Sequence, residues 1–186
     1  RRVLFRSGTG SIKFDGSNDW LLSKHDPGFN IESGDFTIEG WYYRIGTGRH
    51  SIINKRPSSG NSGFELRIEP STNYPVFYFT GGSSFGTINY SMPSNQWVYI
   101  AVVRSGSNAA LFVDGQRKAS SSSWADGTSN TGSLRLGHGT QVSNDYLNGY
   151  LDDFRLTKGV ARYDPTQTTH TVPSTRSEEH TSELQS

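Results

Sequence analysis

The sequence predicts an all-β domain in which two antiparallel sheets pack face to face. Short runs of alternating apolar and polar residues recur at the spacing of about 8–12 residues that is typical of sandwiches and barrels. Turn-forming residues separate these runs, and the chain of 186 residues contains 21 glycines. Aromatic residues make up 12% of the chain and all hydrophobic residues together only 32%, which favours short strands over helices. No apolar run of about 18 residues occurs, so we predict no membrane span.

The first half of the chain contains six strand-like segments. In one of them, residues 63–69, three apolar residues alternate with Glu65, Arg67 and Glu69. Because successive side chains of a strand point to opposite faces, this alternation predicts one face in the core and a charged face in water. The six segments are residues 11–15, 20–22, 36–44, 51–55, 63–69 and 76–80.

The second half contains the clearest strands. Residues 97–104 are nearly all apolar, which predicts a central strand that is buried on both faces. Residues 109–113 and 116–119 flank Asp114-Gly115, a type I′ turn signal, and therefore predict a hairpin. Further strands are expected at 133–137 and 150–156, and a short helical turn at 158–163.

The two ends of the chain resemble translated adapter DNA. One choice of codons for residues 176–186 has a reverse complement that translates to residues 1–7. A basic arm and an acidic tail of biological origin are the alternative. We predict that both ends are adapter-derived scars on an insert of environmental DNA, that 8–164 is a single domain, and that 165–175 is a linker to other domains of a longer chain.

Charge and cysteine content exclude several functions. Without the two ends the chain has 14 basic and 14 acidic residues, and its only basic pairs are Lys55-Arg56 and Arg117-Lys118. This balance predicts no nucleic-acid binding. Cysteine is absent, which removes disulfides, thiolate nucleophiles and cysteine-based zinc sites.

Six segments together resemble the laminin G-like, concanavalin A-like domain. The resemblance implies a two-sheet antiparallel jelly-roll sandwich in a single domain. The ending 157–163 also resembles versions of the domain found in phage structural and tail proteins. The matching segments are residues 11–16, 36–41, 97–104, 111–115, 134–137 and 149–156.

The expected motifs of an enzyme are missing. Glucanases of this fold carry Glu-x-Asp-x-x-Glu on a strand, whereas Glu65 and Glu69, the best-placed pair here, are separated by Arg67. The segment 82–86 matches Gly-x-Ser-x-Gly, but its surroundings predict a hairpin loop and not a strand followed by a helix. The histidines show no metal-ligand spacing. We therefore predict that the domain is not an enzyme.

Calcium is the one cofactor that the sequence favours. The resemblance implies an ion near the join of the first and last strands, where hard oxygen ligands are available. Turn chemistry is the alternative, since Asp and Asn side chains commonly accept hydrogen bonds from their own backbone. The predicted ligands are Asp15, Asn18, Asp19 and Asp152.

Glycan binding requires aromatic faces on loops beside amides and carboxylates. Trp124 is the leading candidate, with the alternative that it folds back to close an open end of the sandwich. Trp41 and Trp97 lie mid-strand and are expected in the core, whereas Trp20 fits either role. The predicted glycan-binding residues are Trp124, Asp126, Tyr90, Asn144, Asp145 and Tyr146.

These patterns predict a non-catalytic recognition module that binds a glycan or surface polysaccharide through its end loops. The module would belong to a phage tail or cell-surface protein, in an extracellular or virion-surface location. The alternative is a structural or protein-interaction domain of a virion or envelope protein. A glycoside hydrolase is a third possibility that the missing acid pair disfavours.

Overall fold

The computed structural model describes most of the chain. The described residues are 4–6, 9–31, 33–58, 62–79, 84–86, 89–124, 126–127, 129–140 and 145–174.

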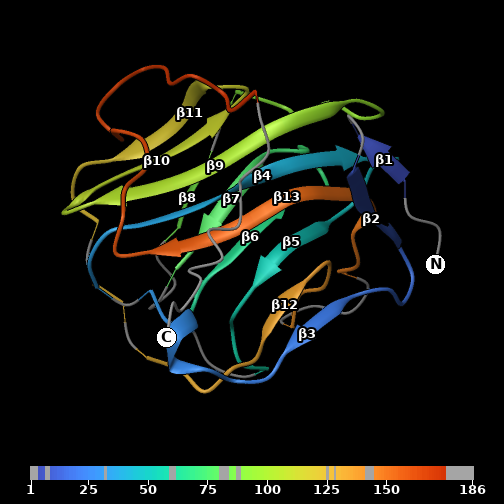
Figure 1. Ribbon diagram of the computed structural model, residues 1–186, viewed down its shortest axis with the longest axis horizontal. Helices are drawn as coiled ribbons and strands as arrows, with labels where there is room; N and C mark the ends of the chain where they lie inside the picture. Colours follow the sequence, from blue (N-terminus) through green and yellow to red (C-terminus); the bar gives the residue numbers. More distant parts are fainter. Residues whose placement is uncertain are drawn as a thin grey trace, which may run out of the picture.

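Two antiparallel sheets form a sandwich, which confirms the predicted fold class (Figure 1). The first sheet consists of β1 (Leu4–Arg6), β2 (Thr9–Asp15), β13 (Asn148–Lys158), β4 (Phe36–Arg44), β9 (Trp97–Ser105), β10 (Asn108–Val113) and β11 (Gln116–Ser121), in that order. The second consists of β3 (Leu21–Ser23), β12 (Leu134–Leu136), β5 (His50–Asn54), β6 (Glu65–Ile68), β7 (Pro75–Tyr78) and β8 (Ser84–Gly86). The helical content of the described residues is one 3-10 turn, η1 (Pro27–Phe29).

The main core lies between the two sheets. Phe36, Ile38 and Tyr42 of β4 point inward and are fully buried, as the two-residue period of a strand requires. Leu66 and Phe77 of the opposite sheet meet them there. Burial of these large side chains supplies the main driving force for closing the sandwich.

The outer face of the seven-stranded sheet carries a second hydrophobic cluster. Tyr99, Ala101 and Val103 of β9 are buried on this face while their neighbours along the strand face the core, so the prediction of a strand buried on both sides is confirmed. Tyr163 and Val172 pack over this cluster.

The segment that covers this second cluster includes residues 158–163 and part of the predicted linker 165–175. The prediction of a helical turn at 158–163 is wrong. Residues 158–163 form the end of β13 and an irregular bend. Beyond them, Thr169 forms a β-bridge with Gln116, and the His170 ring stacks on Tyr163 at 3.7 Å. The packed structure therefore extends at least to Val172, which helps to cover the apolar outer face of β9.

Glu39 of β4 is buried on the same outer face and fully paired. The hydroxyls of Tyr99 and Tyr163 each donate a hydrogen bond to its carboxylate at 2.6 Å. Arg155 and Arg162 approach the other carboxylate oxygen at 2.6 and 2.9 Å. Burial alone would raise the pKa of Glu39, but these donors outweigh it and lower the pKa. Through its contacts with Arg162 and Tyr163, Glu39 links β4 to the C-terminal segment.

Two predicted core tryptophans face outward instead. Trp41 and Trp97 are partly exposed on the outer face of the seven-stranded sheet. The ring of Trp97 contacts that of Tyr43 edge to face and that of Tyr150 in a tilted arrangement. Their strands carry apolar residues on both faces, so hydrophobicity alone did not distinguish the inner face from the outer one.

The predicted domain ends are only partly covered by the described residues. The backbone of β1 pairs with β2, with Leu4 opposite Ser11, although residues 1–7 were predicted to be foreign. The C-terminal segment 176–186 lies outside the described residues. Ser84 of the Gly-x-Ser-x-Gly pattern begins strand β8, which pairs with β7, while residues 82 and 83 lie outside the described part.

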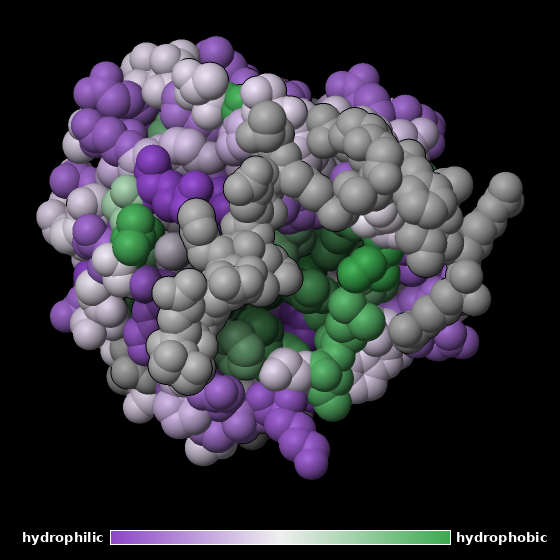
Figure 2. Space-filling view, viewed as in Figure 1, coloured by the Kyte–Doolittle hydropathy of each residue, from purple (hydrophilic) through white to green (hydrophobic). Residues whose placement is uncertain are grey.

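On the face shown in Figure 2, hydrophilic residues form most of the rim and hydrophobic residues gather around a hollow near the centre. Among the described residues, the exposed large hydrophobic side chains are those of Ile12, Leu22 and Val160. No helix in the described part of the chain has the length and apolar character needed to cross a membrane.

Candidate functional site

A polar row crosses the outer face of the six-stranded sheet. Arg135 of β12 lies opposite Asn54 of β5, which lies opposite Glu65 of β6, which lies opposite Tyr78 of β7. Directly paired residues of antiparallel strands share a face. Leu66 points into the core, so its neighbour on β6, Glu65, points to the outer face. The residues paired with Glu65 across the strands therefore lie on the outer face as well.

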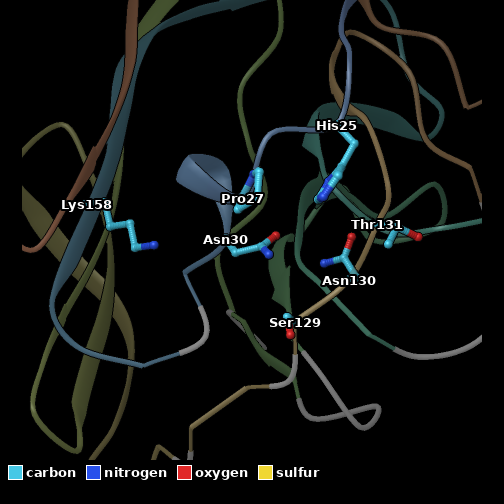
Figure 3. A pocket seen from close by; sticks show the side chains of 7 residues that line it. All are labelled: His25, Pro27, Asn30, Ser129, Asn130, Thr131 and Lys158. Atoms are coloured by element: carbon cyan, nitrogen blue, oxygen red, sulfur yellow. The ribbon is translucent and has the colours of Figure 1, made fainter.

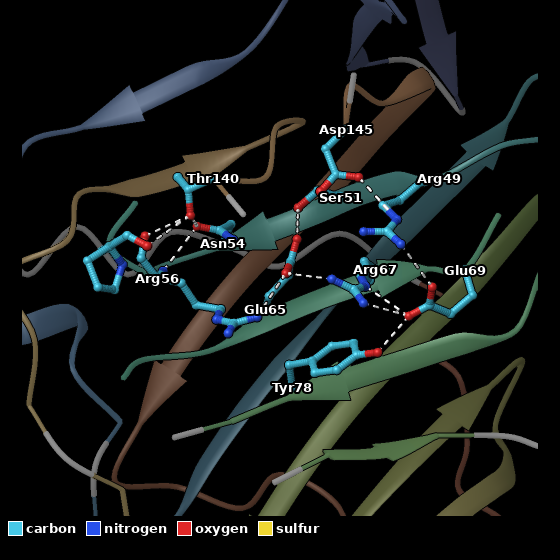
Figure 4. Close-up of polar contacts among 11 residues, drawn as sticks. Arg49, Ser51, Asn54, Arg56, Glu65, Arg67, Glu69, Tyr78, Thr140 and Asp145 are labelled. Atoms are coloured by element: carbon cyan, nitrogen blue, oxygen red, sulfur yellow. Dashed lines mark hydrogen bonds and ion pairs between the residues drawn. The ribbon is translucent and has the colours of Figure 1, made fainter. Parts of the chain in front are cut away.

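The charged face of β6 was predicted to lie in water, and this is wrong. Glu65 is fully buried and Arg67 nearly so. Ser51 Oγ donates to Glu65 at 2.8 Å, and Arg67 and Arg56 lie 3.4 and 3.6 Å from its second carboxylate oxygen (Figure 4). The sequence did not reveal this burial because alternation identifies a polar face but not what covers it.

Glu69 continues the network at the end of β6. It accepts hydrogen bonds from Arg67 at 2.8 and 2.9 Å and from the Tyr78 hydroxyl at 2.7 Å. The Arg67 guanidinium also lies 3.9 Å from the centre of the Tyr78 ring. Burial would raise the pKa of Glu69, but the hydrogen bonds from Tyr78 and Arg67 outweigh it and hold the pKa below its usual value.

Asp145 is the least satisfied charged group of this face. Its residue is 1% exposed, and neither carboxylate oxygen has a hydrogen-bond partner. The nearest cation is Arg49, whose Nε lies 3.6 Å away. Burial, followed by repulsion from Glu65, raises the pKa of Asp145 to about 6. A Cβ at Gly139 would collide with the carboxylates of Asp145 and Glu65, so a larger residue there would require these side chains to shift.

An aromatic stack adjoins this charged network. The rings of His138 and Tyr146 stack at 4.3 Å with an interplanar angle of 19°, and Trp20 lies 5.6 Å from His138. All three side chains are partly exposed, and the Arg135 guanidinium lies 5.6 Å from the centre of the Trp20 ring. A β-bridge between His138 and Tyr146 fixes the two stacked rings.

Buried polar atoms without partners concentrate around this stack. They include Nδ1 of His138 and Nδ2 of Asn54, in addition to both oxygens of Asp145. Buried polar atoms are normally hydrogen-bonded to protein, water or ligand. The burial of His138, together with the charge of Arg135, lowers the pKa of its imidazole and favours the neutral ring.

The structure brings together only part of the predicted glycan site. Asp145 and Tyr146 lie in the region just described, and Asn144 falls outside the described residues. Asp126 is exposed and pairs with Arg104 at the end of β9. Tyr90 packs against the core with Lys118 4.5 Å from its ring centre.

Trp124 is not an exposed binding platform, which corrects the leading prediction for this residue. It is 7% exposed and packs against Phe79 at 5.2 Å and Phe85 at 5.0 Å. This position agrees with the alternative in which the indole closes the sandwich. A loop rich in Ser and Gly suggested exposure, but the large apolar ring was free to turn inward because its neighbours are small.

The sequence missed His138 and Arg135 and left Trp20 ambiguous. The missed signal was cross-strand pairing: Arg135, Asn54 and Glu65 become one row only when the register is known.

Three of the four predicted calcium ligands, Asp15, Asn18 and Asp19, lie in one turn, whereas Asp152 lies apart from them. Asp15 accepts hydrogen bonds from the backbone N–H groups of Ser17, Asn18 and Asp19, which is the turn chemistry of the alternative. Asp15 pairs with Asn148 of β13, four residues before Asp152, a separation of about 13 Å along a strand. Ca²⁺ ligands lie about 2.3–2.6 Å from the ion, so Asp152 does not fit the same cage. Among the described residues, no group of three or more His, Asp or Glu side chains has the arrangement of a metal site.

Comparison with known families agrees with this architecture. Residues 15–162 match a laminin G family model described as the concanavalin A-like lectin/glucanases superfamily. The chain belongs to this superfamily. No curated protein sequence matches the chain.

Several solved structures share the superfamily fold. One is a Bacteroides ovatus protein described as carbohydrate binding, with a TM-score of 0.64 and 20% identity over 82% of this chain. This chain spans only 44% of that protein. Another is domain 4 of AbnA, an extracellular arabinanase from Geobacillus stearothermophilus solved with arabinotriose, with a TM-score of 0.64 and 15% identity over 90% of this chain and 78% of the other. Mouse laminin α1 domains LG4-5 match with a TM-score of 0.58 and 15% identity, over 89% of this chain and 47% of the other.

Proposed function

We propose that this domain is a non-catalytic carbohydrate-binding module whose site is the outer face of the six-stranded sheet. The partly exposed stack of Trp20, His138 and Tyr146, with the Arg135 guanidinium 5.6 Å from the centre of the Trp20 ring, carries the proposal. Aromatic rings cover the apolar face of a sugar, and the partly exposed Arg135 guanidinium can donate hydrogen bonds to its hydroxyls.

The same geometry favours binding over hydrolysis. Hydrolysis of a glycosidic bond requires two carboxyl groups that flank the substrate. Glu65 is fully buried and occupied by Ser51, Arg56 and Arg67, so it is not available to a sugar in this way. The Bacteroides protein and the AbnA domain, which is solved with arabinotriose, support a sugar ligand by analogy of fold. An extracellular or virion-surface protein, with this module as one part, is the setting that we propose.

Glycan binding by the full chain tests the proposal. The probes are a glycan array with and without Ca²⁺, followed by calorimetry with arabinotriose and with the best array ligand. We expect Trp20→Ala and Tyr146→Ala to weaken binding at least tenfold, or about 1.4 kcal/mol. Trp97→Ala is the matched control, because Trp97 is a partly exposed tryptophan on the other sheet. Absence of binding to every glycan, or equal loss in the control, would reject the proposal.

A structural or protein-interaction domain is the second candidate. The partly exposed rings of Tyr43, Trp97 and Tyr150 on the seven-stranded sheet favour it, because clustered aromatic side chains are typical of protein interfaces. A folded chain that binds no glycan, and whose association with another protein is lost in Trp97→Ala, would support this candidate.

A further inference from the structure

A polar pocket lies at one end of the sandwich, formed by loops that the proposed binding face does not use. Its cavity volume is about 500 Å³, which lies within the usual range for small-ligand sites. Three segments form it: the loop and turn around η1, the loop before β12, and the end of β13 (Figure 3). The described lining residues are His25, Pro27, Asn30, Ser129, Asn130, Thr131 and Lys158.

Asn30 supplies an unsatisfied acceptor in this pocket. The residue is only 7% exposed, and its Oδ1 has no hydrogen-bond partner. Figure 3 shows its side chain directed toward His25 and Asn130 across the cavity. A buried carbonyl oxygen of this kind requires a donor, such as a hydroxyl group.

Asn130 is held in a fixed orientation on the opposite wall. Its Oδ1 accepts hydrogen bonds from Gly132 N at 2.8 Å and from Lys55 Nζ at 3.5 Å. Lys55 Nζ also donates to the carbonyl of Gly132 at 3.0 Å. Because Asn130 Oδ1 is already engaged, its Nδ2 is the group left to donate to a ligand.

The charge of the pocket is positive. Lys158 lies at its exposed side, and the buried ammonium of Lys55 lies behind the Asn130 loop. None of the described lining residues is acidic. A ligand with an anionic group is therefore favoured over a neutral one, since no described carboxylate in the wall opposes it.

We infer that this pocket binds a single acidic sugar residue, of the uronic acid class. Sugar hydroxyls donate to Asn30 Oδ1 and accept from Asn130 Nδ2, while the sugar carboxylate faces Lys158. The ligand class rests on the proposed function, but the site shares no residue with the aromatic stack. Either proposal can therefore be refuted without refuting the other.

Three small probes test the inference on the full chain: glucuronate, glucose and acetate. Glucuronate offers both hydroxyls and a carboxylate, glucose only hydroxyls, and acetate only a carboxylate. Binding is followed by the ring resonances of His25 in NMR titrations, assigned with the variant His25→Gln. We expect saturable shifts with glucuronate, at least tenfold weaker binding of glucose and acetate, and weaker glucuronate binding at high salt.

Two variants locate the contacts. We expect Lys158→Gln to weaken glucuronate binding about threefold to fivefold, and Asn30→Ala to weaken it further. Trp20→Ala is the matched control and should leave glucuronate binding at His25 unchanged. Equal affinity for acetate and glucuronate would show that the pocket recognises only the carboxylate, and would refute a sugar site. No shift at His25, or no effect of Lys158→Gln, would overturn the inference.

Discussion

Asp145 makes the stability of the domain depend on pH. Its carboxyl group is buried without a hydrogen bond, and its pKa is raised from the ordinary value of 3.8 to about 6. The folded state therefore holds the proton more strongly than the unfolded state. The free energy of unfolding falls as the pH rises from about 3.8 to about 6, and levels off above that range.

The magnitude follows from the pKa difference. At about 1.36 kcal/mol per pKa unit, the rise corresponds to about 3 kcal/mol, of which about 2 kcal/mol is lost between pH 4.5 and pH 7.5. The variant Asp145→Asn keeps the shape of the side chain and removes the titration. We expect it to be more stable than the wild type at pH 7.5 by about 2–3 kcal/mol, with a smaller difference at pH 4.5.

Urea unfolding of both proteins between pH 4.5 and 7.5 measures this difference. Tyr146→Phe is the control, because it alters the neighbouring residue without removing a carboxyl group. Its stability should follow the pH dependence of the wild type. The reasoning is refuted if Asp145→Asn and the wild type lose stability in parallel, or if the variant is the less stable protein at pH 7.5.

Three further predictions concern the packing of the fold and are checked by chemical denaturation. We expect Glu39→Gln to lower the free energy of unfolding by about 3 kcal/mol, because it removes the charge that two tyrosines and two arginines surround; a loss below 1 kcal/mol would contradict the role assigned to this group. Trp124→Ala should lower the free energy of unfolding by about 3–5 kcal/mol, because it truncates a core side chain. An unchanged free energy of unfolding would contradict the burial of Trp124. Ending the chain after Tyr163 should destabilise it by about 2 kcal/mol, since the part of the cover that contains Val172 is removed. Ending the chain after Ser174 is the control, and equal stability of the two proteins would contradict this packing role.

The candidate site was predicted only in part, and the reason is geometric. Asp145 and Tyr146 were identified as polar and aromatic residues on a loop, and both lie at the proposed face. The other polar residues of this face lie on strands whose neighbours in space are far away in sequence. Arg135 pairs with Asn54, and Ser51 donates to Glu65, although no local pattern connects these residues.

Burial was the property that sequence patterns predicted least well. The charges of β6 suggested a wet face, yet Glu65 is buried within a network of arginines. Trp97 was predicted to be a core residue but is partly exposed on the outer face of its sheet. Trp124 was predicted to be exposed on a loop but is buried. Whether a side chain is buried depends on what packs over it, and that partner comes from another part of the chain.

By itself, the sequence determined the fold class and most of the strands. Alternation along each strand and glycine-rich turns are local properties, so they identify a two-sheet sandwich and its central strand β9 without knowledge of the pairing. Only the tertiary structure decided which residues meet. It placed the stack of Trp20, His138 and Tyr146 beside Asp145, and it packed part of the predicted linker against the seven-stranded sheet. These arrangements depend on strand register and on contacts between distant segments, which a local pattern does not encode.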